Sequence, residues 1–306
     1  MQQTLEDRTE SREALCELLQ LIALAAETRP AGANGAMGRI SSQSSALRAA
    51  LLGGDTPRDI LCGRSPVRGI EVAAAEALRP RAARQAHALL AHGIQVVPIW
   101  QLPPQFLPLA PPLALFVRGD RRLLDAAGTS IVGSRNASVA AERWAFARAV
   151  EAVQGGKIVV SGGAVGVDGA AHRGALSAGG PTIVYMGVAV DRCYPARHKE
   201  LFAQIIERGG ALVSEHPPAT SPPRYSHALR NRFIAAHGDT LLIAQAREKS
   251  GTLGTARYAA RLGRSIFVSP PEVGGDRGGL DWLLAGGLAT VAGPRDAPAG
   301  RCEAPL

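Results

Sequence analysis

The sequence predicts an α/β protein: a Rossmann-like, doubly wound, mostly parallel sheet, preceded by a smaller, mainly helical N-terminal domain. From about Gly128 onward, short β-branched runs alternate with Ala-rich helical runs. Several of the short runs are continuously apolar, such as IVV at 158–160 and LLIA at 241–244. Uninterrupted apolar strands separated by helices are typical of a parallel sheet covered on both faces. The strand starts recur roughly every 24–30 residues, which suits one βα unit each.

The N-terminal region has helical spacing of apolar residues at 11–26 and Ala/Leu/Arg-rich helical runs at 45–52 and 71–92, with a short strand at 94–100. Five prolines between 103 and 112 exclude an ordinary helix there, because proline fixes φ and lacks an N–H donor. We therefore expect a helical domain at 1–102, a Pro-rich connector and lead-in at 103–127, the sheet domain at 128–290 and a short tail at 291–306.

Six further strands are predicted in the sheet domain, at 129–132, 157–161, 182–186, 211–214, 240–244 and 265–268. Ligands of such sheets bind beyond the carboxyl ends of the strands. The loops that follow these strands are therefore the segments to examine for function.

The charge balance favours an anionic partner. The chain has a formal net charge of +8, and only three of its 34 basic residues are lysines. Arginine suits phosphate because its planar fork binds two oxygens at once. A GC-rich genome accounts equally well for the excess of arginine. Aromatic residues make up only 4% of the chain, so stacking can carry little of any ligand binding.

Composition and termini disfavour secretion, a structural metal and a membrane span. The four cysteines form no CxxC pair and no His/Cys cluster with zinc spacing. The start of the chain is acidic and polar, and no apolar run reaches the ~18 residues that a membrane helix needs. We expect a cytoplasmic protein without a membrane anchor.

Three strand-end loops place Gly, Ser or Thr just before a helix: 133–136, 161–164 and 250–255. Glycine lets the backbone approach a ligand, and helix N-termini offer free N–H groups to anions. Two of the loops add a cation, Arg135 or Lys249. Any one loop alone can be ordinary turn chemistry, but three on one edge of a sheet predict an anion site.

A basic stretch lies between residues 224 and 264, with eight basic and two acidic residues and hence a charge of +6. It contains Arg230-Asn231-Arg232, whose i, i+2 spacing puts the two arginines on different sides of a helix. One can face a ligand while the other packs or pairs. A solvated charged face is the alternative.

Signs of catalysis are weak. The candidate acids Asp168, Asp191, Glu215 and Asp239 form no paired motif; we expect Asp168 to cap a helix and His172 to bond locally. The sequence has no G-x-S-x-G elbow, no Walker A loop and no G-x-G-x-x-G after the first strand of the sheet domain. A nicotinamide enzyme is disfavoured, and no cofactor is expected.

Taken in order, six motifs resemble the DprA/Smf family of DNA-processing proteins. They are GSR at 133–135, SGGAVGVDGAAH at 161–172, YPARHKEL at 194–201, SEHPP at 214–218, RNRFIAA at 230–236 and SGTLGTA at 250–256. The resemblance covers about 115–290 and implies an extended Rossmann core. It also implies a cytoplasmic, homodimeric, non-enzymatic protein. Such a protein binds single-stranded DNA, protects incoming DNA and assists loading of the RecA recombinase in natural transformation.

The resemblance also implies a basic DNA groove at the strand ends. Arg135 would hold a backbone phosphate, the loops at 161–163 and 250–252 would offer N–H and hydroxyl groups, and Arg197, Arg230 and Arg232 would add charge. The predicted nucleic-acid-binding residues are Gly133, Ser134, Arg135, Ser161, Gly162, Gly163, Arg197, Arg230, Asn231, Arg232, Lys249, Ser250, Gly251, Thr252 and Thr255. Tyr194, Tyr225 and His227 are the nearby candidates for base stacking, although core packing is the more common role of a residue such as Tyr194.

The sequence departs from the family pattern in three ways. It has no clear Gly-x-Gly helix-hairpin-helix signature, we expect no winged helix after residue 290, and Gln245 stands where the family usually has Glu.

The rival function is a nucleotide phosphoribohydrolase of the LOG type, whose P-G-G-x-G-T-x-x-E motif needs a carboxylate where this chain has Arg257 or Tyr258. Arginine would oppose a developing oxocarbenium ion. A nucleotide-sensing module is a third possibility.

Overall fold

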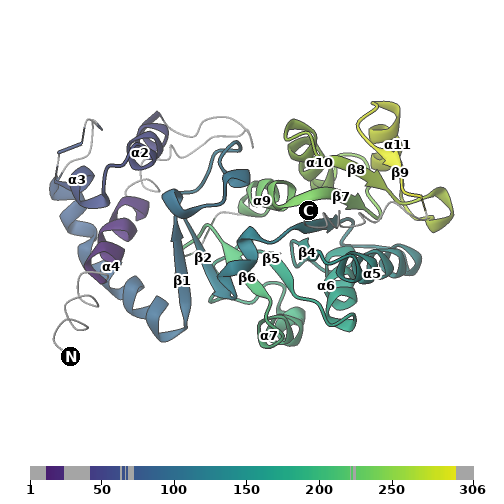
Figure 1. The fold of residues 1–306 in the computed structure, drawn as a ribbon, viewed down its shortest axis with the longest axis horizontal. Coiled ribbons are helices and arrows are strands. Elements are labelled where there is room, and N and C mark those ends of the chain that lie inside the picture. Colours follow the sequence, from purple (N-terminus) through teal and green to yellow (C-terminus); the bar gives the residue numbers. More distant parts are fainter. Residues whose placement is uncertain are drawn as a thin grey trace, which may run out of the picture.

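A nine-stranded sheet runs through the described part of the molecule, in the order β1-β2-β6-β5-β4-β3-β7-β8-β9 (Figure 1). The computed structural model describes residues 12–23, 42–62, 64–65, 67, 72–220, 222 and 225–293. The strands are β1 (Ile94–Pro98), β2 (Ala114–Gly119), β3 (Gly128–Val132), β4 (Ile158–Ser161), β5 (Thr182–Tyr185), β6 (Ala211–Ser214), β7 (Gly238–Ile243), β8 (Ser265–Val268) and β9 (Thr290–Val291). All neighbours pair in parallel except β1–β2 and β2–β6. The predicted doubly wound, mostly parallel sheet is confirmed.

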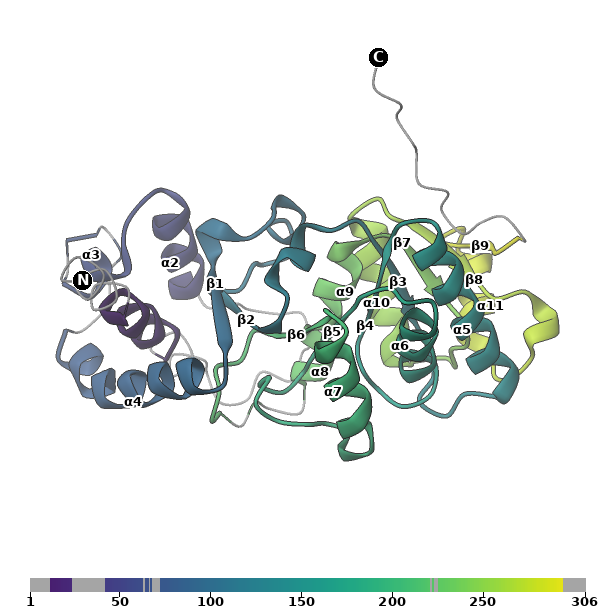
Figure 2. The same cartoon turned by 60° about the horizontal axis from the view of Figure 1, so that its bottom comes forward.

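Helices cover both faces of the sheet, as the continuous apolar strands predict (Figures 1 and 2). One face carries α5 (Val139–Gln154), α6 (Val167–Ser177) and α7 (Lys199–Glu207); the other carries α9 (Asn231–His237), α10 (Gly251–Arg261) and α11 (Gly278–Ala285). Alternate strand residues serve the two faces. Val159 and Leu242 pack with α5 and α6, whereas Val160 and Leu241 pack with α9 and α10. Burial on both faces therefore explains why these strands do not alternate in polarity.

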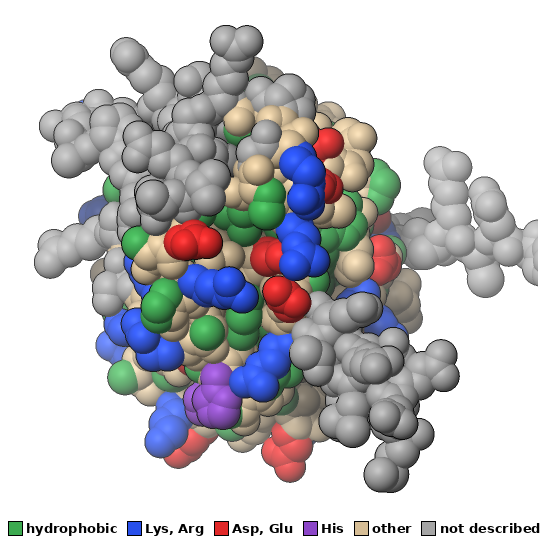
Figure 3. Space-filling model, turned by 90° about the vertical axis from the view of Figure 1, so that its left-hand side faces the viewer, with side chains coloured by type: hydrophobic (Ala, Val, Ile, Leu, Met, Phe, Trp, Pro, Cys, Tyr) green, Lys and Arg blue, Asp and Glu red, His purple; other side chains and the backbone are tan. Residues whose placement is uncertain are grey.

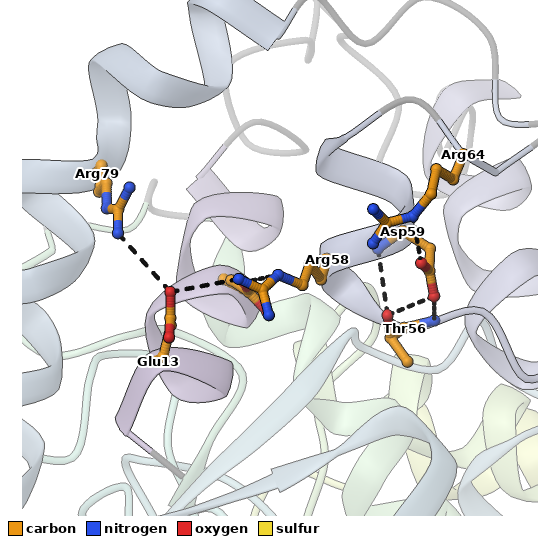
Figure 4. A network of polar contacts seen from close by, with 7 residues as sticks. Glu13, Thr56, Arg58, Asp59, Arg64 and Arg79 are labelled. Atoms are coloured by element: carbon orange, nitrogen blue, oxygen red, sulfur yellow. Dashed lines mark hydrogen bonds and ion pairs between the residues drawn. The ribbon is translucent and has the colours of Figure 1, made fainter. Parts of the chain in front are cut away.

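The described part of the N-terminal region is mainly helical, with a helix over residues 12–23 followed by α2 (Ser42–Leu52), α3 (Pro57–Leu61) and α4 (Val72–Ala91). Thr56 begins α3 with a reciprocal cap, because its Oγ1 accepts from the Asp59 N–H and its own N–H donates to the Asp59 carboxylate (Figure 4). Glu13 forms ion pairs with Arg58 at 3.7 Å and with Arg79 at 3.9 Å (Figure 4). These pairs link the helix at residues 12–23 to α3 and α4. Such exposed pairs contribute little each.

Acidic and basic side chains are interspersed on the face that this helical end presents (Figure 3). A surface of mixed sign does not concentrate an anion. Among the described helices, none is long and apolar enough to cross a membrane.

The structure differs from the predicted connector at 103–127. Strand β1 pairs with β2, and β2 pairs with β6, so the sheet extends across the expected boundary at residue 102. The Pro-rich stretch lies between β1 and β2 and forms only a short 3-10 turn, Pro104–Phe106. Phe106 is buried with its ring centroid 6.2 Å from that of Tyr185 and 5.7 Å from that of His237. The prolines therefore exclude a helix, as expected, but the segment packs into the core.

Candidate functional site

A pocket in the described structure lies where the strand order of the sheet reverses. The chain proceeds outward from β3 through β4 and β5 to β6, then returns to β7 on the opposite side of β3. The loops after β3 and β7 consequently separate, and an open α/β sheet forms its ligand crevice at such a point. A pocket of about 850 Å³ occupies this crevice, between residues 133–138 on one side and residues 245–255 on the other.

Three helices begin at this pocket: α5 after Ser138, α6 after Gly166 and α10 after Ser250. The first N–H groups of a helix have no partner within it and carry partial positive charge. The Ser138 side chain caps α5 by accepting from the Ala141 N–H at 3.1 Å. By contrast, Ser250 makes no such cap on α10, and its buried Oγ has no hydrogen-bond partner. The start of α10 therefore offers backbone N–H groups to an anion, as does the start of α6, which also lacks a side-chain cap.

A second, smaller pocket of about 160 Å³ adjoins the first, and Arg135, Ala164, His227 and Arg230 line both. Five cations line the two pockets, against the carboxylates of Asp168 and Asp276. The cations are Arg135, Arg197, Arg230, Arg247 and Lys249. All of them except Arg230 are exposed. The combined surface is therefore positive and open to a phosphate.

Arg230 is a buried cation held beneath the loop after β4. It is only 5% exposed, and its Nη1 donates to the Tyr185 carbonyl at 2.6 Å while its Nε donates to the His227 carbonyl at 3.2 Å. A Cβ on Gly162 would lie 1.7 Å from Arg230 Nη1, so a larger residue there would displace the guanidinium. Burial lowers the pKa of Arg230 to about 10, and Asp168 opposes that shift. Arg230 is therefore charged at neutral pH.

Asp168 does not cap α6, contrary to the prediction. Gly166 occupies the cap position with a φ of 77°, and Asp168 is the second residue of the helix. Its carboxylate instead accepts from the Ala164 N–H at 3.3 Å. Burial raises the pKa of Asp168, and the neighbouring Arg230 opposes this.

His172 does not bond locally either. Its Nδ1 lies 2.8 Å from Thr182 Oγ1, on a different element, and burial lowers its pKa to about 3.

Arg232 is not at the pocket, although the sequence predicted it as a binding residue. Its guanidinium is buried and meets Glu215 through two contacts, Nη2–Oε2 at 2.6 Å and Nη1–Oε1 at 3.1 Å. It also lies 4.0 Å from the centre of the Phe233 ring. Of the two arginines, Arg230 therefore lines the pockets, whereas Arg232 pairs with Glu215.

All the predicted residues except Ser161 and Arg232 line one of the two pockets. Gly133, Ser134, Arg135, Arg230, Asn231, Lys249, Ser250, Gly251, Thr252 and Thr255 line the larger pocket, and Gly162, Gly163 and Arg197 line the smaller one. Ser161 is buried, and its Oγ donates to the Ile131 carbonyl at 2.5 Å. Ser161 therefore supports the glycine loop at residues 162–163.

The basic stretch does not form one face. Arg247 and Lys249 line the larger pocket, whereas Arg264 donates to the Ala236 carbonyl and Arg257 lies 5.6 Å from the Trp282 ring. Arg224 lies outside the described residues.

Gln245, which the sequence analysis noted only as a departure from the family pattern, lines the larger pocket. Its Oε1 accepts from the Ser138 N–H at 2.9 Å, and its carbonyl accepts from the Ser134 N–H at 2.8 Å. Gln245 thereby joins the loop after β7 to the loop after β3. Its position as the residue that follows a buried strand was the available signal.

Tyr194 lies at the smaller pocket and is 52% exposed, so the core-packing alternative is wrong. Its ring centroid is 5.1 Å from that of His227. Tyr225 is also exposed but lines neither pocket.

A family model and several curated proteins match this chain. Residues 103–296 match the family model for DNA recombination-mediator protein A. Protein Smf of Escherichia coli K12 is 37% identical over 196 residues, which cover 63% of this chain and 52% of that protein. DNA processing protein DprA of Streptococcus pneumoniae is 32% identical over 186 residues, which cover 60% and 65%. The matches span about half the length of the first of these curated relatives.

Two solved structures share the fold. The X-ray structure of the Streptococcus pneumoniae DprA has a TM-score of 0.63 and 25% identity, and the alignment covers 82% of this chain and 90% of that one. The Helicobacter pylori DNA processing protein A has a TM-score of 0.58 and 31% identity, with 64% and 89% covered. That structure was solved to explain how the Helicobacter protein binds single-stranded DNA.

Proposed function

The chain belongs to the DNA recombination-mediator protein A family, the DprA/Smf proteins, and on that premise we propose that it binds single-stranded DNA in the two strand-end pockets. The binding would serve to protect incoming DNA during natural transformation. The Helicobacter pylori relative, 31% identical, was solved for its binding of single-stranded DNA. The match to the family model, nearly two thirds of this chain, includes every residue that lines the pockets.

The convergence of cations and helix N-termini at one sheet edge carries this proposal. Arg135, Arg247 and Lys249 come from separate loops, yet all line the crevice into which α5, α6 and α10 begin. Contacts of this kind neutralise phosphates irrespective of sequence. We propose that the backbone of a single strand enters this crevice between the loops.

We further propose a binding protein rather than a base-cleaving enzyme. At the positions where the phosphoribohydrolase motif needs a carboxylate, Arg257 is exposed against Trp282 and Tyr258 packs against the core. Neither residue lines the pocket. Of the two carboxylates that do, Asp168 is buried beside the Arg230 cation, which disfavours a developing oxocarbenium ion.

Assistance of RecA loading, a homodimeric state and a cytoplasmic location complete the proposal. Family membership supports these three parts of the proposal. Chemical cross-linking of the purified protein, alone and with RecA on single-stranded DNA, tests the first two directly.

The test of the proposed function is equilibrium binding of a labelled oligo-dT at several salt concentrations, with unlabelled duplex of equal length as competitor. Neutralisation of four or five phosphates predicts a slope of log K against log salt of about −3 to −3.5. A parallel incubation with AMP measures release of free base. Salt-sensitive binding that duplex displaces poorly, with no base released, supports the proposal. Equal competition by duplex, absent salt dependence or release of adenine overturns it.

A further inference from the structure

Helix α4 of the N-terminal region packs on the loop that follows β5, and it lies at the β1 end of the sheet (Figures 1 and 2). Ala82 and Ala86 of α4 are buried in one apolar cluster with Met186 and Val190 of that loop. Met186 also lines the smaller pocket, and Val190 comes four residues later in the chain. Four residues span at most about 14 Å, so α4 is packed close to the pocket.

Two hydrogen bonds link the same elements. The Asp191 carboxylate accepts from the Ala219 N–H at 2.9 Å, which joins the loop after β5 to the loop after β6. The carbonyl of the adjacent Pro218 accepts from Gln85 Nε2 at 3.4 Å, which joins the loop after β6 to α4. The smaller pocket, these two loops and α4 therefore adjoin one another.

The flank of α4 that contacts these loops carries two arginines. Arg81 comes four residues before Gln85 and three before Arg84, so it neighbours both on the helix surface. Both arginines are exposed. Glu76 is the one acidic residue in the sequence of α4, and it neighbours Arg79 on the other flank. The flank beside the loops is therefore positive.

The loop after β5 carries positive charge from the pocket toward this flank. Residues 187–199 include three basic residues and one acidic residue, and hence have a charge of +2. Arg192 and Arg197 are exposed, and Arg197 lines the smaller pocket. The acidic residue is Asp191, which bonds the Ala219 N–H. Exposed cations therefore follow one another from the pocket to α4, as in surfaces that track the backbone of a single strand.

We propose that the bound single strand continues from the smaller pocket across the loop after β5 and over α4, where Arg81 and Arg84 bind its phosphates. The N-terminal region thereby forms a second part of the DNA interface. It lengthens the binding site without reading sequence, because its contacts are to the backbone. This inference rests on the proposed binding of single-stranded DNA.

The test compares two lengths of oligo-dT: about 6 nucleotides, enough for the pockets, and about 20 nucleotides, enough to reach α4. The variant Arg81→Gln with Arg84→Gln removes both cations. For the long oligomer, this variant should bind about tenfold more weakly than the wild type at low salt. Its slope of log K against log salt should be shallower by about 1.4, since each phosphate contact on a single strand contributes about 0.7. For the short oligomer, both quantities should match the wild type.

Two further variants serve as controls. Arg79→Gln removes an exposed arginine from the other flank of the same helix, where it pairs with Glu13 at 3.9 Å. This variant should bind both oligomers as the wild type does. Arg84→Gln alone should show about half of the change in slope. Thermal melts followed by circular dichroism establish that each variant is folded.

The outcomes separate the two proposals. Failure of the wild type to bind either oligomer overturns the proposed function. Binding of both oligomers by the wild type, with no loss in the double variant, equal losses at the two lengths, or an equal loss in Arg79→Gln, overturns the site on α4 alone.

Discussion

Replacing Arg232 with Met should reduce folding stability and leave DNA affinity unchanged. In the structure this arginine is a buried partner of Glu215, 9% exposed at its side chain against 10% for the carboxylate. Its nearest contact to Glu215 is 2.6 Å, and its Nη1 also donates to the Leu229 carbonyl at 2.8 Å. These contacts leave the guanidinium away from the pockets.

The size of the effect follows from the geometry. Two opposite charges about 4 Å apart attract by about 4 kcal/mol at an effective dielectric constant of about 20. Removing one partner of a buried pair leaves the other uncompensated and typically costs about 3–5 kcal/mol. Replacing both partners with apolar residues is often close to neutral. Arg232→Met should therefore lose about 4 kcal/mol, and Arg232→Met with Glu215→Leu should recover at least half of that.

The assay is urea denaturation at pH 7 of the wild type, both single variants and the double variant, with oligo-dT binding measured on each folded protein. A coupling free energy of about 2 kcal/mol or more from the cycle, with an unchanged salt slope, supports the reasoning. If Arg232→Met stays within 1 kcal/mol of the wild type and its salt slope falls by about 0.7, the guanidinium contacts DNA and the reasoning is refuted.

Three other variants or conditions test separate parts of the site. Gly162→Ala forces a methyl group against Arg230, so it should lower the free energy of unfolding in urea by about 1–3 kcal/mol and weaken DNA binding. Gly254→Ala is the control, because a Cβ there meets open space, and it should be neutral or stabilising. Equal effects of the two substitutions would contradict the packing of Gly162 on Arg230. Gln245→Ala frees the Ser138 N–H and should cost about 1–2 kcal/mol and weaken oligo-dT binding severalfold; unchanged binding would show that the two loops hold without it. His172 and His237 are buried, with pKa values lowered by burial to about 3 and about 4. The unfolded chain, with a histidine pKa near 6.5, binds more protons below that pH, so the free energy of unfolding should fall by roughly 2–3 kcal/mol between pH 6 and pH 5. Stability that is flat over this range would contradict neutral, buried histidines.

The sequence predicted the sheet well where the strands are buried on both faces. The runs at β4, β7 and β8 are uninterrupted because helices cover them on each side. Strand β2 was not predicted. It follows the Pro-rich stretch directly and joins the sheet antiparallel, so it is not part of a βα unit and the regular spacing of strand starts does not indicate it. Strand β9 has only two residues, too few for a pattern.

The Gly, Ser and Thr residues of the strand-end loops predicted where the site lies. Which residues line it depends on tertiary contacts that the sequence does not show. Gly133, Gly162 and Gly251 follow strands whose carboxyl ends must share an edge, so their convergence was predictable. The spacing of Arg230 and Arg232 separates their directions but does not say which one faces the pocket. That choice depends on Glu215, seventeen positions away, and on the shape of the Gly162 loop.

The salt dependence of oligo-dT binding in two arginine variants tests the central claim most directly. Arg135 lines both pockets, whereas Arg118 on β2 is equally charged, exposed and absent from both. Arg135→Gln should weaken binding and make the slope of log K against log salt shallower by about 0.7 for each lost phosphate contact, and Arg118→Gln should match the wild type. Identical slopes for the two variants would contradict phosphate binding at the strand-end pockets.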